Sequence, residues 1–304
     1  MCPADPTSRP TVVLAAAAHP DDIEFMMAGT LLLLADAGAA VHMWNLASGS
    51  CGTATHRRDE LVRLRWAESQ ASAAVAGAEM IPPLADDFAL YYGPGLLARA
   101  AAVVRRVRPD ILLVPSPADY MEDHTNACRL LVTAAFVRGM PNFAADPPTE
   151  PVAGDEGKSP ARVFAKSPTP EARGPVQTQA GDVVIYHASP YGLRDGLRRL
   201  VRPGQFVDIA GVLARKRRML ACHRSQKEWL DVSQGLDAYL NEMESMARQV
   251  GQMSGRFEFA EGWRRHSHLG FARSADVDPL GELLGAACWT DPAYEASLES
   301  GSGE

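Results

Sequence analysis

Short apolar runs alternate with longer helical patterns along most of the chain, and this alternation limits its fold more than any other feature. The runs lie at residues 11–18, 41–46, 111–115, 183–188 and 205–210. Apolar strands separated by helices are typical of a parallel sheet that is buried on both faces. The sequence therefore predicts an α/β fold in which a mostly parallel sheet carries helices on both faces.

Helical periodicity predicts helices over residues 23–37, 56–76, 95–106, 124–136, 212–223 and 232–253. The stretch 139–181 is instead rich in Pro, Ala, Gly and charged residues, which predicts a mobile surface insertion. Residues 295–304 have the composition of a flexible tail. We therefore expect residues 1–304 to form a single domain with this insertion and a frayed end.

Composition argues against several classes of protein. The chain of 304 residues carries a formal net charge of −7, without the basic surplus that nucleic-acid binding needs. The first apolar run is only about eight residues long, which is too short for a membrane span, and no basic segment precedes it as in a secretion signal. The five cysteines form no CxxC pair, which favours reduced thiols. We expect a cytoplasmic protein with no membrane span and no nucleic-acid partner.

Polar residues that can bind a metal follow the first apolar run. In an open α/β sheet, ligands bind at the carboxyl ends of the strands, and His19, Asp21 and Asp22 stand at that point. His19 and Asp22 can converge on one ion across the strand-to-helix turn, which Pro20 stiffens. Asp21 faces another side. A carboxylate beside a metal-bound water that does not itself bind the metal is suited to accept the proton of that water.

His124, which comes after the run at 111–115, is the natural third ligand. Two imidazoles and one carboxylate leave an open position on Zn²⁺ for water and substrate, as catalytic zinc sites do. Asp123 and Asp119 are candidates for orienting a ligand or the base. Taken alone, a His at a strand end is more often structural, and an Asp at a helix start is usually an N-cap. The combination of both segments favours a metal site.

Two segments resemble a known family. AHPDDIEFMMAGT at 18–30 and EDHTNACRL at 122–130 are similar to the two metal-binding segments of the LmbE-like (PIG-L) N-acetylglucosaminyl deacetylase superfamily. The resemblance covers most of residues 11–136. It implies a Rossmann-like fold, a Zn²⁺ cofactor or another divalent metal such as Fe²⁺, and the ligands His19, Asp22 and His124. It also implies that Asp21 is the general base, and it is compatible with a homo-oligomer.

The same resemblance extends to a helix in which Arg65 precedes Glu68 by three residues. The guanidinium of Arg65 suits oxygen-rich ligands, so Arg65 is a candidate for binding a substrate hydroxyl or phosphate. A solvent-exposed ion pair with Glu68 is the alternative. His187 at a later strand end and His266 near the C-terminus are two further candidates for substrate binding, or else surface residues. Met121 departs from the family, which often has a His at this position.

The predicted function is a zinc-dependent hydrolase that removes the N-acetyl group from an N-acetylglucosamine-type small molecule or glycoconjugate. Its partner would be a small amino-sugar substrate. One alternative is an iron oxygenase, since two His and one carboxylate also form such a site, although strand–helix alternation does not suit a jelly roll. Another alternative is a metal-dependent sugar-binding protein without turnover. The first turn has no G-x-G-x-x-G, which argues against dinucleotide binding.

Overall fold

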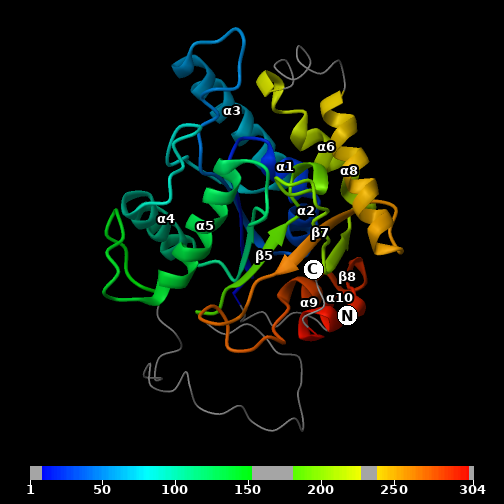
Figure 1. Ribbon diagram of the computed structural model, residues 1–304. Coiled ribbons are helices and arrows are strands. Elements are labelled where there is room, and N and C mark those ends of the chain that lie inside the picture. The colour runs from blue at the N-terminus through cyan, green and yellow to red at the C-terminus, as the bar shows by residue number, and fades with distance from the viewer. Residues whose placement is uncertain (1–8, 153–180, 227–237, 301–304) are drawn as a thin grey trace.

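The computed structural model describes residues 9–152, 181–226 and 238–300 (Figure 1). Most of the insertion expected at 139–181 therefore lies outside the described residues, as do positions 301–304 of the expected tail. The described part of that tail is helical as far as Ser300. No described helix has both the length and the apolar character that a membrane crossing requires.

The core of the described chain is one mixed sheet with the strand order β3-β2-β1-β4-β5-β7-β6-β8. The strands are β1 (Val12–Ala17), β2 (Ala40–Asn45), β3 (Glu79–Ile81), β4 (Ile111–Val114), β5 (Val184–Ala188), β6 (Gln205–Asp208), β7 (Ala260–Arg265) and β8 (Cys288–Thr290). Neighbours from β3 to β5 pair in parallel, and the pairs of β5 with β7, β7 with β6 and β6 with β8 are antiparallel. The predicted α/β class with a mostly parallel sheet is confirmed.

Helices cover both faces of this sheet, as the sequence predicts (Figure 1). The α-helices are α1 (Asp22–Met26), α2 (Ala28–Asp36), α3 (Arg58–Ala76), α4 (Pro94–Val107), α5 (Glu122–Phe136), α6 (Leu213–Leu220), α8 (Ala238–Ser254), α9 (Pro279–Leu284) and α10 (Pro292–Ser300). One hydrophobic cluster packs α1, α2 and α6 on the sheet, and a second packs α4 and α5 on the opposite face. Alternate residues of β1 divide between these clusters, so β1 is buried on both sides.

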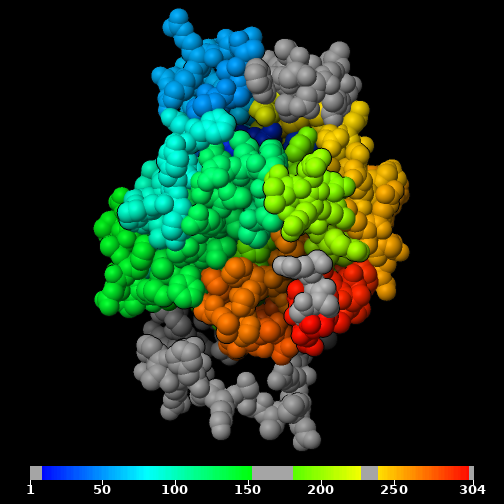
Figure 2. All heavy atoms as spheres, in the orientation of Figure 1, coloured from blue at the N-terminus to red at the C-terminus, as the bar shows by residue number. Residues whose placement is uncertain are grey.

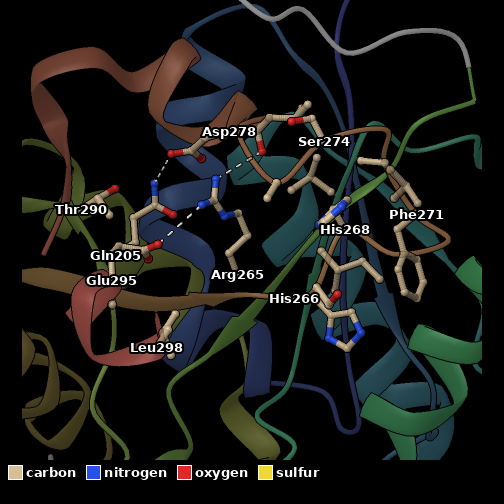
Figure 3. Close-up of a pocket in the computed structure, with 18 of the residues that line it drawn as sticks. Gln205, Arg265, His266, His268, Phe271, Ser274, Asp278, Thr290, Glu295 and Leu298 are labelled. Carbon is tan, nitrogen blue, oxygen red and sulfur yellow. Dashed lines mark hydrogen bonds and ion pairs between the residues drawn. The ribbon is translucent and has the colours of Figure 1, made fainter. Parts of the chain in front are cut away.

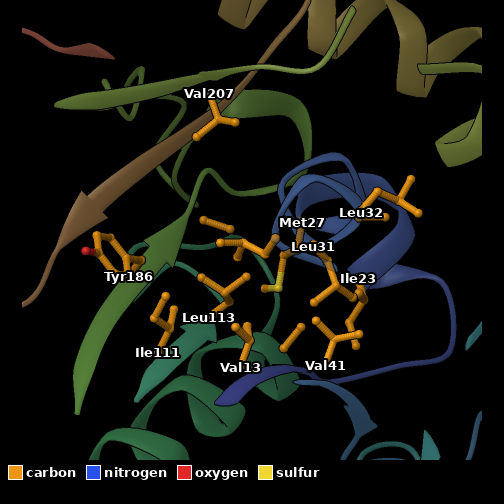
Figure 4. Packing of buried hydrophobic residues seen from close by; sticks show 14 of the residues in the cluster. Val13, Ile23, Met27, Leu31, Leu32, Val41, Ile111, Leu113, Tyr186 and Val207 are labelled. Carbon is orange, nitrogen blue, oxygen red and sulfur yellow. The ribbon is translucent and has the colours of Figure 1, made fainter. Parts of the chain in front are cut away.

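Figure 4 shows the first cluster, in which Met27 and Leu31 lie over Val13, Ile111 and Leu113 of the central strands. In the view of Figure 2 only a small dark-blue area is visible between later segments, in keeping with the burial of β1. Burial of β1 fixes its carboxyl end, where the polar turn begins. The turn that follows β1 is therefore anchored to a buried strand of the core.

The helix expected over 23–37 is divided in two at Met27, whose φ of −133° is not helical. The division has a physical cause in β7. The carboxylate of Glu261 accepts hydrogen bonds from the backbone N–H groups of Gly29 (2.8 Å) and Thr30 (2.7 Å), so it caps α2 in place of carbonyls from α1. A Cβ at Gly29 would lie 2.5 Å from Ile209 Cγ2, which explains glycine at this close approach.

The sequence analysis did not expect β3, β7 or β8, and of these only β7 lies inside the sheet. Its residues Ala-Glu-Gly-Trp-Arg-Arg form no apolar run, yet β7 lies between β5 and β6. The strand that joins the parallel and antiparallel parts of the sheet therefore comes from a segment without a simple strand pattern. The parallel strands end together at one edge, which gathers the residues that follow β1, β2, β4 and β5.

Candidate metal centre

His19, Asp22 and His124 meet at this edge of the sheet. One ligand atom from each lies within 4.8 Å of the other two. Asp22 Oδ2 lies 3.5 Å from His19 Nδ1 and 3.4 Å from His124 Nε2, and the two imidazole centroids are 5.4 Å apart. Two imidazole nitrogens and one carboxylate oxygen at these separations form a donor set that fits a divalent ion such as Zn²⁺. The sequence predicted this convergence from segments more than a hundred residues apart.

Each imidazole is held by a carboxylate on its other nitrogen. Asp123 Oδ2 lies 3.0 Å from His19 Nε2, and Asp119 Oδ1 lies 3.0 Å from His124 Nδ1. Asp123 also accepts a hydrogen bond of 2.7 Å from the backbone N–H of Phe88. Such partners fix the orientation and tautomer of histidines that bind metals. The structure thus pairs both carboxylates with candidate ligands, as the sequence analysis suggested.

The charges of the three residues depend on one another. Burial lowers the pKa of His19, but hydrogen bonds to Asp123 and Asp22 outweigh it and raise the value to about 10. Burial also opposes protonation of His124, while the charge of Asp22 and the bond to Asp119 raise its pKa to about 11. Burial acts to raise the pKa of Asp22. The charges and hydrogen bonds of the two imidazoles outweigh this effect and lower the pKa of Asp22 below its usual range. In this state protons occupy the nitrogens that a metal ion would need.

Asp21 lies beside the three residues without joining them. It precedes α1 with a φ of 107°, in the left-handed region, and its side chain is 7% exposed. The hydroxyl of Tyr239 on α8 donates a hydrogen bond of 2.6 Å to Asp21 Oδ2. Burial, and then the charge of Asp22, raises the pKa of Asp21 to about 6. A carboxylate with this pKa can accept and return a proton near neutral pH.

A small cavity of about 30 Å³ opens beside Asp22 and His124. Apolar side chains supply much of its wall, among them Met26, Met27 and Ala188. It has room for a group of one or two heavy atoms. Tyr191 also lines it, and the exposed ring of Tyr120 lies 5.7 Å from the His124 ring and 6.3 Å from the Tyr191 ring. The candidate metal centre therefore has an apolar recess and an aromatic border.

Arg65 lies near this centre, but it is buried beneath the loop that follows β2. It is 3% exposed, and its Nη2 donates to the carbonyl of Gly52 (2.6 Å) and to Gln226. Gly49, with a φ of +73°, allows the loop to pass, since a Cβ there would lie 2.3 Å from Arg65 Cδ. Glu68 does not pair with Arg65 at the surface, because it is buried and accepts two hydrogen bonds from Ser225.

His187 and His266 are brought together, but away from the candidate ligands. His187 Nδ1 donates to the carbonyl of Pro115 (3.1 Å), which leaves its Nε2 to accept from His266 Nδ1 at 2.9 Å. Burial lowers the pKa of His187 to about 4, so the ring is neutral. His266 lines a separate cavity of about 270 Å³, near His268 and Phe271 and opposite Asp278 (Figure 3). Neither residue lines the recess beside Asp22 and His124.

Sequence reasoning missed the residues that support the turn from the C-terminal third. Besides Tyr239, the imidazole of His223 lies 3.1 Å from Glu24 Oε1, and both side chains are 1% exposed or less. Ser72 also donates to Glu24, at 2.5 Å. One signal was present in α3, where Arg65, Glu68, Ser69 and Ser72 recur at helical spacing. All four are buried, so this polar stripe marks the helix face that contacts the site.

Comparison with known proteins shows which family the chain resembles. Residues 14–136 match the model of the PIG-L family, described as GlcNAc-PI de-N-acetylase. The diacetylchitobiose deacetylase of Thermococcus kodakarensis is 30% identical over 258 residues, which cover 83% of this chain and 82% of that protein.

Two solved structures share the fold. The N,N′-diacetylchitobiose deacetylase of Pyrococcus horikoshii has a TM-score of 0.64 at 22% identity, with 88% of each chain covered. The 4-carboxy-2-hydroxymuconate hydratase GalB of Pseudomonas putida has a TM-score of 0.62 at 21% identity, covering 84% of this chain and 96% of that one. The fold alone thus does not fix the reaction. The family model, the 30% identical relative and the shared architecture together show that the chain belongs to the PIG-L (LmbE-like) de-N-acetylase family.

Proposed function

We propose that this protein is a metal-dependent N-deacetylase, which hydrolyses the N-acetyl group of an amino-sugar-containing small molecule. One observation carries the proposal: His19, Asp22 and His124 offer three ligand atoms within 4.8 Å, beside a buried carboxylate, Asp21, that is not among them. Relatives of this chain are named as deacetylases, which supports the same reaction for this protein.

His19, Asp22 and His124 would hold the metal, for which we propose Zn²⁺ because the donor set is nitrogen-rich. When bound, zinc lowers the pKa of a water and polarises a carbonyl oxygen. Asp123 and Asp119 keep the two imidazoles in orientation. Asp21 accepts the proton of the attacking water and delivers it to the departing amine, because it is a buried carboxylate that lies beside the three ligands without joining them.

The recess beside Asp22 and His124 would take the methyl group of the acetyl. Its volume of about 30 Å³ and its apolar wall match a group of that size. Arg65 would act on the substrate indirectly, because its Nη2 holds the loop at Gly52. His187 and His266 have no part in the proposed site, since they pair with each other and neither lines the recess. A cytoplasmic location, homo-oligomer formation and the absence of a nucleic-acid partner remain predictions from the sequence.

The test is acetate release from a panel of N-acetylated amino sugars, with zinc and with a chelator. Asp21→Asn should bind zinc normally and lose at least about 100-fold in kcat, because Asn cannot accept the proton. Full turnover by this variant would exclude Asp21 as the base. Assays of double-bond hydration would detect a hydratase such as GalB, and oxygen consumption would detect an oxygenase. Zinc and sugar binding without acetate release would identify a non-catalytic sugar-binding protein.

A further inference from the structure

The backbone of Asp21 needs support from its surroundings. Its φ of 107° lies in a region that side-chain-bearing residues rarely adopt. Such a conformation costs about 1–3 kcal/mol and persists only where neighbouring groups hold it. The backbone carbonyl of Asp21 accepts a hydrogen bond of 3.0 Å from Phe25 N, which fixes the chain on one side of the residue. The side chain requires a separate support.

Tyr239, on a helix far along the chain, supplies that support. Its hydroxyl donates a hydrogen bond of 2.6 Å to Asp21 Oδ2 across 218 positions of sequence. The ring packs edge-on against Phe25, with centroids 5.0 Å apart, and belongs to a buried cluster with Leu220 and Met243. Burial, and then the charge of Asp21, raises the pKa of Tyr239 well above its usual value, so the hydroxyl remains a donor. Core packing therefore fixes where the hydroxyl can be.

This contact makes the two oxygens of Asp21 unequal. Oδ2 is occupied by the tyrosine hydroxyl, whereas no residue in the described ranges donates a hydrogen bond to Oδ1. Rotation of the carboxylate would break the bond to Tyr239. A base with one engaged oxygen presents the other in a constant direction, and such alignment matters because small misplacements cost much of the rate.

We propose that Tyr239 is a positioning residue for the reaction, which holds Asp21 in its left-handed conformation and assigns the proton-accepting role to Asp21 Oδ1. The inference rests on the proposed role of Asp21 as the base. It places one determinant of catalysis on α8, outside the region 14–136 that matches the family model.

The test is Tyr239→Phe, which removes only the hydroxyl. We expect kcat for acetate release to fall about 10- to 100-fold, while KM and zinc content stay within twofold, because the ligands and the recess are untouched. Tyr186→Phe is a matched control. The hydroxyl of Tyr186 donates a bond of the same 2.6 Å length to Asp278 Oδ1, in an equally buried position that does not line the recess beside the ligands. This control should retain kcat. Unchanged kcat in Tyr239→Phe, or an equal loss in Tyr186→Phe, would overturn the inference.

Two further measurements separate this inference from the proposed function. In an Asp21→Asn background, Tyr239→Phe should have no additional effect on residual turnover, and a further loss of similar size would show that Tyr239 acts elsewhere. Crystal structures of the wild type and of Tyr239→Phe need no substrate. We expect the Asp21 carboxylate to turn in the variant. An Asp21 side chain that keeps its orientation would refute the positioning role, even if the wild type released no acetate from any substrate.

Discussion

A buried ion pair next to the turn with the candidate metal ligands allows a quantitative test of the fold. Lys216 on α6 and Glu261 on β7 are 1% and 3% exposed, and Lys216 Nζ lies 2.6 Å from Glu261 Oε1. The ammonium also donates to the carbonyl of Phe25 at 2.8 Å. Lys216→Met preserves most of the apolar stem and removes the charge. The variant would leave the carboxylate of Glu261 without a countercharge.

Removing one member of a buried pair costs about 3–5 kcal/mol, because the remaining charge is uncompensated. Glu261 would keep its two bonds from Gly29 N and Thr30 N, so we expect Lys216→Met to cost about 3 kcal/mol, at the lower end of that range. The double variant Lys216→Met with Glu261→Gln leaves no buried charge, but its amide can accept from only one of Gly29 N and Thr30 N, so we expect it to recover only part of the loss. Comparison of the single and the double variant thus tests whether the ion pair contributes to stability through its charges or through packing.

Urea unfolding can be followed through Trp44 and Trp263, which are fully buried and will report the transition. Arg215→Met is the matched control, because Arg215 is the neighbouring residue on α6. Its pair with Asp36 is partly exposed, at 31% and 49%, and should contribute less than about 1 kcal/mol. If Lys216→Met destabilised the protein no more than Arg215→Met, the reasoning about the buried pair would be refuted.

Three further predictions concern the candidate metal centre. Asp119→Asn should weaken zinc binding about 10- to 100-fold in a chelator competition, while Asp86→Asn, at a more exposed carboxylate, should not. Zinc binding at pH 7 should release about two protons, because His19 and His124 have pKa values of about 10 and 11; affinity should therefore rise with pH, which calorimetry in several buffers would measure. N-butanoyl substrates should turn over at least about tenfold more slowly than N-acetyl ones in parallel assays, because the recess is small.

The convergence of the candidate metal ligands could be predicted because the signals are local. His19 and Asp22 lie on one turn at a strand end, and parallel strands bring His124 to the same edge. The carboxylates that orient the imidazoles were also within reach, since Asp119 and Asp123 precede His124 closely. In each case, the spacing of residues within a short segment and one rule of sheet topology are sufficient to predict that these side chains lie together.

Other features depend on contacts that no local pattern reveals. The division between α1 and α2 results from Glu261, 232 positions after Gly29. The contact between Tyr239 and Asp21 depends on how α8 packs, and α8 shows only its own amphipathic period in the sequence. Likewise, β7 is a strand because it pairs with β5 and β6 on its two sides, not because its residues have strand propensity.

The pairing of each imidazole with a carboxylate has a consequence for how the protein matures. His19 is oriented by Asp123, and His124 by Asp119, so one short stretch after β4 organises both halves of the donor set. A nascent chain that has been synthesised past β1 but not yet past β4 would lack this arrangement. Loading with metal should therefore await synthesis and docking of the fourth strand, and an N-terminal fragment ending before it should capture zinc only weakly.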